Sequence, residues 1–127
     1  MARIVLDASF LIDHLRARPA AVERLRAIYE AGDDPILTDV ASAEIWSGWR
    51  APEETAIQSF LQYFEFVQPG PETSRLAGIW RAEARARGST LGTMDALIAA
   101  CAFHLNAAVL TRNVRDFALT PVRVETY

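Results

Sequence analysis

The segment Arg3–Ser9 constrains the fold of this chain more than any other part of the sequence. Its apolar residues run without a break and favour a strand that is buried on both faces, as in a parallel sheet covered by helices. Asp7 stands at the carboxyl end of this strand, where ligands bind in open α/β sheets. A carboxylate there is costly to desolvate unless a metal ion or a hydrogen-bond donor compensates it. The simpler alternative is that Asp7 only caps the helix that follows.

The length of 127 residues is sufficient for one domain with a full core, and we expect a single domain over residues 1–127. The formal net charge of −3 argues against non-specific, charge-driven binding of nucleic acid. It does not exclude a nucleic acid substrate, because a metal would neutralise acids clustered around it. The single Cys101 cannot form an internal disulfide, which fits a reducing compartment. Without a signal-peptide pattern or a run of ~20 apolar residues, we expect a cytoplasmic protein that does not enter the membrane.

Short apolar segments alternate with helical patterns along the chain. The expected strands are Val5–Leu6, Ile36–Thr38, Phe66–Val67, Ala107–Leu110 and Val122–Glu125. The expected helices are Ser9–Ala17, Ala20–Ala31, Val40–Trp49, Pro52–Phe64, one from Pro71 to Arg87, and Met94–Leu105. We expect Thr38 or Asp39 to cap the third helix, and Thr93 to cap the last helix, which is apolar on all sides and therefore buried. The alternation predicts an α/β fold with parallel strands, right-handed crossovers and helices on both faces of the sheet.

Four acidic residues stand in surroundings that are wrong for a solvated surface, namely Asp7, Glu44, Asp95 and Asp116. In a doubly wound domain they share one rim, because two follow strands and two lie in early turns of helices. Taken singly, Glu44 also fits a solvent-facing helix position, Asp95 a partner of the helix dipole and Asp116 a turn residue. Taken together, four converging carboxylates would repel one another, and Mg²⁺ or Mn²⁺ with oxygen ligands is the natural compensation.

A carboxylate-bound magnesium centre is used chiefly for phosphoryl chemistry, in which the metal activates water and holds the scissile phosphate. Zinc is disfavoured, because His14, His104 and Cys101 form no ligand pattern. A phosphatase with an aspartate nucleophile is also disfavoured, because it needs a second acid where Ser9 stands and a late lysine, and the chain contains no lysine.

Basic and aromatic side chains suggest where a substrate and a partner could bind. Candidates for contact with the phosphates of a nucleic acid are Arg81, Arg85 and Arg112, although each also fits a solvated surface. The third and fourth helices carry more aromatic residues than one small face needs to bury, namely Trp46, Trp49, Phe60, Tyr63 and Phe64. They could form a groove for a partner helix, with core packing as the alternative.

Four segments, in this order, resemble the PIN-domain nucleases of the VapC toxin type: Ile4–Asp13, Ser42–Ile45, Thr93–Ala100 and Leu110–Phe117. The resemblance covers the whole chain. It implies a three-layer α/β/α PIN-like domain with a five-stranded parallel sheet, and an endoribonuclease that depends on Mg²⁺ or Mn²⁺. It also implies a homodimer and a cognate VapB-like antitoxin. The alternatives are a PIN-domain nuclease outside a toxin pair, such as one for RNA maturation, and a non-catalytic module that binds RNA or protein.

Carried over position by position, the resemblance makes Asp7 and Asp95 the metal ligands. Glu44 and Asp116 would complete the catalytic pocket through waters, a second metal or proton transfer. Water would then hydrolyse the phosphodiester and leave a 5′-phosphate and a 3′-hydroxyl.

The resemblance also assigns supporting roles around these acids. Ser9 would bond to a neighbouring carboxylate, and Thr111 and Asn113 would orient the acidic cluster. The last motif is ambiguous, because some relatives place the fourth acid where Asn113 stands and others where Asp116 stands.

Overall fold

A five-stranded parallel sheet forms the centre of the computed structural model, which describes all 127 residues. The strand order is β3-β2-β1-β4-β5, and each neighbouring pair is parallel. The strands are β1 (Arg3–Leu6), β2 (Asp34–Thr38), β3 (Glu65–Val67), β4 (Ala108–Leu110) and β5 (Val124–Glu125). The predicted α/β class and the five parallel strands are therefore confirmed.

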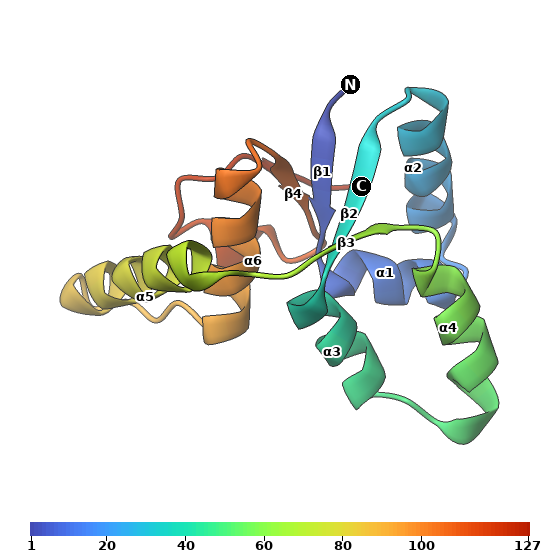
Figure 1. The fold of residues 1–127 in the computed structure, drawn as a ribbon, viewed down its shortest axis with the longest axis horizontal. Coiled ribbons are helices and arrows are strands. Elements are labelled where there is room, and N and C mark those ends of the chain that lie inside the picture. Colours follow the sequence, from blue (N-terminus) through green and yellow to red (C-terminus); the bar gives the residue numbers. More distant parts are fainter.

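Six α-helices connect and cover the strands. They are α1 (Ala8–Leu15), α2 (Pro19–Glu30), α3 (Asp39–Ser47), α4 (Glu54–Leu61), α5 (Pro71–Ala86) and α6 (Thr93–His104), with short 3₁₀ turns η1 (Ala51–Glu53) and η2 (Val114–Phe117). Figure 1 shows α1 and α2 on one side of the sheet and α6 on the other, with α5 outside α6. None of the helices combines the length and the apolar character needed to cross a bilayer.

The position of β1 explains where a site can form. Val5 and Leu6 are fully buried, as expected for a central strand covered by helices on both faces. From β1 the chain winds outward through β2 to β3, and it then returns to the other side of β1 to form β4. The topological switch point therefore lies between β1 and β4, and ligands bind beyond the carboxyl ends of strands at such a point. The register pairs Leu6 with Leu110, which places Asp7 beside Thr111.

Several expected boundaries need correction. The fifth strand is limited to Val124–Glu125, because β5 pairs only with β4 at the edge of the sheet. The fourth helix opens with the 3₁₀ turn η1. Thr93 does not cap α6: it is the first helical residue, and the cap position is held by Gly92, which has no side chain. Thr38 does cap α3, since the Ala41 N–H donates to Thr38 Oγ1 over 3.1 Å.

The last helix is not buried on every side. Its middle residues from Ala96 to Ala102 are almost all buried, whereas Phe103 is 51% exposed. The Phe103 ring packs edge-on against Trp80 of α5, with the two ring centroids 5.6 Å apart. The helix therefore leaves the core at its carboxyl end, and its side chains are exposed where the sheet no longer covers them.

Candidate active site

Asp7 is buried at the start of α1, and its side chain does not cap that helix. It occupies the cap position with extended backbone but makes no capping hydrogen bond, so the helix-cap alternative is wrong for the side chain. Asp7 Oδ2 instead accepts hydrogen bonds from Ser9 Oγ at 2.7 Å and from Thr111 Oγ1 at 2.8 Å. Oδ1 accepts none from the protein. Two hydroxyls thus fix the carboxylate and leave one oxygen available to a ligand.

The loop after β4 is tied to the start of α1 through the same hydroxyls. The Arg112 N–H donates to Ser9 Oγ over 3.0 Å, and the Asn113 N–H donates to Thr111 Oγ1 over 2.9 Å. The side-chain amide of Asn113 is exposed and makes no hydrogen bond. In this structure the backbone of Asn113, rather than its side chain, supports the site.

Glu44 lies on α3, where the charges of Asp7 and Asp95 act on its carboxylate. Its Oε1 atom is buried and has no hydrogen-bond partner. Burial, followed by the charges of Asp7 and Asp95, raises the pKa of Glu44 to about 7. An unpartnered carboxylate oxygen in this position disfavours the interpretation of Glu44 as a solvent-facing helix residue.

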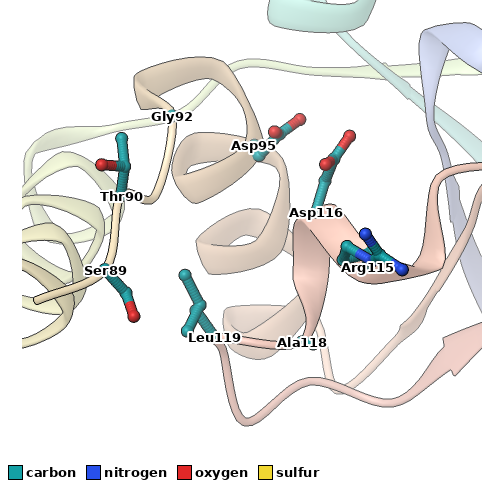
Figure 2. A pocket seen from close by; sticks show the side chains of 8 residues that line it. All are labelled: Ser89, Thr90, Gly92, Asp95, Arg115, Asp116, Ala118 and Leu119. Carbon is teal, nitrogen blue, oxygen red and sulfur yellow. The ribbon is translucent and has the colours of Figure 1, made fainter. Parts of the chain in front are cut away.

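Asp95 projects from the first turn of α6 and is half-buried. Burial raises the pKa of Asp95 to about 6, with further contributions from the charges of Asp7 and Asp116. Figure 2 shows the carboxylates of Asp95 and Asp116 directed toward the same space, although Asp116 itself is exposed on η2. The structure therefore brings all four predicted acids close enough to influence one another.

No cation of the protein neutralises these four acids. The ion pairs of the structure involve other carboxylates throughout. As the side chains stand, no three His, Cys, Asp or Glu residues are close enough to share one ion. The acids thus form a pocket with oxygen donors, and not a closed ligand shell. A hard divalent cation suits such a pocket, because it prefers oxygen ligands and can keep several of its waters.

Asp13 is a charged residue near the site that the sequence reasoning did not single out. It is 2% exposed and accepts hydrogen bonds from Arg112 Nη1 at 2.7 Å and from the Tyr127 hydroxyl at 2.6 Å. The Arg18 guanidinium lies 3.3 Å from the same carboxylate. The helical spacing in the sequence could have indicated that Asp13 is buried, because Asp13 lies three residues after Phe10 and therefore on the buried face of its helix.

The three arginines that the sequence suggests as phosphate contacts differ in whether their guanidinium groups bond to other parts of the protein. Arg112 is held by Asp13, and Arg81 Nε donates to the Leu91 carbonyl over 2.9 Å. Arg85 is exposed and forms no ion pair. Among the three, only Arg85 has a guanidinium that is entirely free to meet a ligand.

The aromatic residues of the third and fourth helices divide between core and surface. Phe64 is buried, whereas Trp49 is 45% and Tyr63 is 75% exposed. Close to Trp49, a groove of about 310 Å³ lies between α1, α3 and η1–α4, with Ile12, Leu15 and Ile57 in its wall. This part of the surface combines exposed aromatic side chains with an apolar groove.

Comparison with known proteins agrees with this architecture. The family model described as PIN domain matches residues 4–121. Ribonuclease VapC19 of Mycobacterium tuberculosis is 28% identical over 117 residues, which cover 92% of this chain and 94% of the relative.

Two solved structures show a similar fold. One is VapBC2 from Rickettsia felis bound to a DNA fragment from its promoter, with a TM-score of 0.87, 20% identity, and coverage of 98% of both chains. The other is DNA-bound VapBC from Salmonella typhimurium, with a TM-score of 0.85, 23% identity, and coverage of 99% of this chain and 98% of the other.

Proposed function

The chain belongs to the PIN-domain family, and from this premise we propose that it is a metal-dependent endoribonuclease, the toxin of a toxin–antitoxin pair. The observation that carries the proposal is the pocket of four acids without a neutralising cation of the protein. The similarity over nearly the whole length to a relative named as a ribonuclease supports RNA as the substrate.

We assign the metal to Asp7 and Asp95, with Mg²⁺ or Mn²⁺ as the ion, because every donor in the pocket is a carboxylate oxygen. Glu44 and Asp116 would complete the site through waters. When bound, such an ion would polarise a water molecule and neutralise charge on the scissile phosphate.

The residues around the pocket determine how it would act. Ser9 and Thr111 hold Asp7 Oδ2, so that Oδ1 remains directed at the ligand. The Glu44 carboxylate would accept the proton of the attacking water, since a pKa of about 7 suits proton exchange near neutral pH. The water oxygen bonds to phosphorus, the bond to the 3′ oxygen breaks, and that oxygen takes a proton from solvent. The products are a 5′-phosphate and a 3′-hydroxyl.

We also propose the partners of this chain. A VapB-like antitoxin would lay an apolar segment into the groove beside Trp49, and a basic side chain of its tail would neutralise the acidic pocket. A homodimer would use the surface where Val40, Met94 and Leu97 line one wide depression between α3, α5 and α6. We place the protein in the cytoplasm, where RNA is present and the free Cys101 stays reduced.

Substitution of the two proposed metal ligands tests the nuclease. Asp7→Asn and Asp95→Asn should each abolish cleavage of RNA in the presence of Mg²⁺ or Mn²⁺, while the far-ultraviolet circular dichroism stays that of the parent protein. Asp33→Asn is the matched control, because Asp33 directly precedes β2 and therefore lies at the amino ends of the strands, opposite to the end where Asp7 lies. Normal turnover by either ligand variant, or an equal loss in the control, would refute the assignment.

The toxin role has its own tests. A short reading frame directly upstream should encode a DNA-binding head and a basic or aromatic tail. Its product should form a complex with this chain and suppress the cleavage, and Trp49→Ala should weaken that complex. An active nuclease without such a neighbour would contradict the toxin role and leave the nuclease intact.

A further inference from the structure

A polar cavity of about 460 Å³ lies beside the acidic pocket. Asp95 and Asp116 form one end of it, and Ser89, Thr90, Arg115 and Leu119 line the rest (Figure 2). The volume falls within the range of about 300–1,000 Å³ that is typical of small-ligand sites. The cavity therefore offers space for a chemical group the size of a nucleotide next to the proposed metal ligands.

The lining of this cavity suits a nucleotide. The hydroxyls of Ser89 and Thr90 make no hydrogen bond within the protein, and Arg115 forms no ion pair. A guanidinium plane can stack on a nucleobase or bond to its edge, and Leu119 supplies apolar contact. Unpaired bases are presented in this way only by single-stranded RNA, because the bases of a duplex are stacked and paired.

A second, smaller cavity continues from the first. It is lined by Arg81, Arg85, Leu91 and the same two residues, Ser89 and Thr90. The hydrogen bond from Arg81 Nε to the Leu91 carbonyl joins the segment between α5 and α6 to α5. Ser89 and Thr90 thus lie between the acidic cavity and Arg85, whose guanidinium forms no ion pair. An RNA strand that extends from the acidic pocket would meet its next phosphate contact at Arg85.

We propose that the larger cavity binds the nucleotide beside the cleaved phosphate of single-stranded RNA, and that the strand then crosses Ser89 and Thr90 to reach Arg85. This inference rests on the proposed nuclease function, since it takes the acids as the place of cleavage. It makes Arg115 a base contact and Arg85 a phosphate contact. With a net charge of −3, the protein has no general attraction for RNA, so a local path of this kind must supply the affinity.

Binding is measured with full-length chain carrying Asp7→Asn, so that RNA is held without being cleaved. The probe is a short fluorescein-labelled single-stranded RNA of mixed sequence, followed by fluorescence anisotropy over a range of KCl at fixed MgCl₂. Adding Arg85→Ala should weaken binding about tenfold and reduce the slope of log K against log salt by about 0.7, the value for one lost phosphate contact on a single strand. Adding Thr90→Trp, which fills the cavity, should weaken binding at all salt concentrations and leave the slope unchanged.

Arg75→Ala is the matched control for Arg85→Ala. Arg75 lies on the same helix, forms no ion pair and lines neither cavity, and it is roughly 15 Å from Arg85 along the helix axis. The Arg75→Ala variant should bind RNA with the same affinity as the Asp7→Asn parent and with the same slope of log K against log salt. In the chain with Asp7 restored, Arg115→Ala should shift the distribution of cleavage sites along a long RNA, because the base next to the cut is no longer recognised.

Unchanged affinity in both the Arg85→Ala and the Thr90→Trp variants would overturn the proposal, as would the absence of any RNA binding by the parent. A wild-type chain that cleaves no RNA, together with Asp7→Asn variants that bind RNA in the predicted pattern, would refute the nuclease function and retain the cavity as an RNA site. If the cavity variants with Asp7 restored cleave RNA at the same sites and with the same KM as the wild type, the nuclease is retained and the cavity is rejected.

Discussion

Replacing Glu44 by Gln is expected to stabilise the metal-free protein at alkaline pH. The pKa of Glu44 is raised from 4.5 to about 7, mainly by burial, so the folded state binds a proton more tightly than the unfolded chain does. Stability is therefore lost as the pH rises from the ordinary value of the carboxyl through about 7. Gln keeps the shape of the side chain but never acquires the charge that is disfavoured beside Asp7 and Asp95.

The size of the effect follows from the shift in pKa. A difference of about 2.5 units corresponds to ~3 kcal/mol at about 1.4 kcal/mol per unit. Glu44 is only partly buried, and screening by solvent reduces this to ~1.5 kcal/mol. We expect the free energy of unfolding of Glu44→Gln to equal that of the wild type at low pH, where Glu44 is protonated. At about pH 8 it should exceed the wild-type value by that amount.

Urea unfolding in EDTA at a series of pH values measures this difference. Glu83→Gln is the control, because Glu83 is exposed on α5 and forms no ion pair. Adding Mg²⁺ should stabilise the wild type, as any ligand of the folded state does, and should remove most of the advantage of Glu44→Gln. The reasoning is refuted if wild-type stability stays level or increases from about pH 5 to about pH 8, or if Glu44→Gln is equally destabilising throughout.

Three further substitutions test the groups around the acids. Tyr127→Phe removes a donor to the buried Asp13, and urea unfolding should show a loss of roughly 1.5–3 kcal/mol. Thr111→Val removes one of the two donors to Asp7 Oδ2, and steady-state assays should show kcat lowered about tenfold or more in a folded protein. Asp116→Asn should lower the pKa of Asp95 toward its ordinary value in carboxyl NMR titrations without metal, whereas Asn113→Ala should leave it unchanged.

The parts of the structure that the sequence predicts correctly are those that local patterns determine. The unbroken apolar run before Asp7 requires a strand covered on both sides, and β1 is the central strand. Helical spacing predicts every α-helix to within a few residues, apart from the 3₁₀ turn at the start of the fourth. The prediction that the four acids lie near one another follows from placing Asp7 and Glu44 at the same rim as the later acids, but no three of them are close enough to share one ion.

The parts that local patterns miss depend on partners far away in the chain. Asp13 has an unremarkable place in a short helix, and its role becomes visible only when Arg112 and Tyr127 pack against it, 99 and 114 positions later. The same ion pair limits the freedom of Arg112, which the sequence presents as an ordinary exposed cation. Gly92, and not Thr93, holds the cap position of α6, because the path of the loop between α5 and α6 determines which residue begins the helix.

The distance along the chain between Asp7 and Thr111 has a consequence for synthesis on the ribosome. Asp7 is translated early, but its hydroxyl partner from the loop after β4 is made 104 positions later. A nascent chain already carries Asp7, Glu44 and Asp95 while the neighbour of β1 on that side is still missing. At that stage the Asp7 carboxylate has only Ser9 as a hydroxyl donor. A fragment that ends before Thr111 therefore keeps Asp7, Glu44 and Asp95 but lacks the hydroxyl that joins the loop after β4 to Asp7 Oδ2.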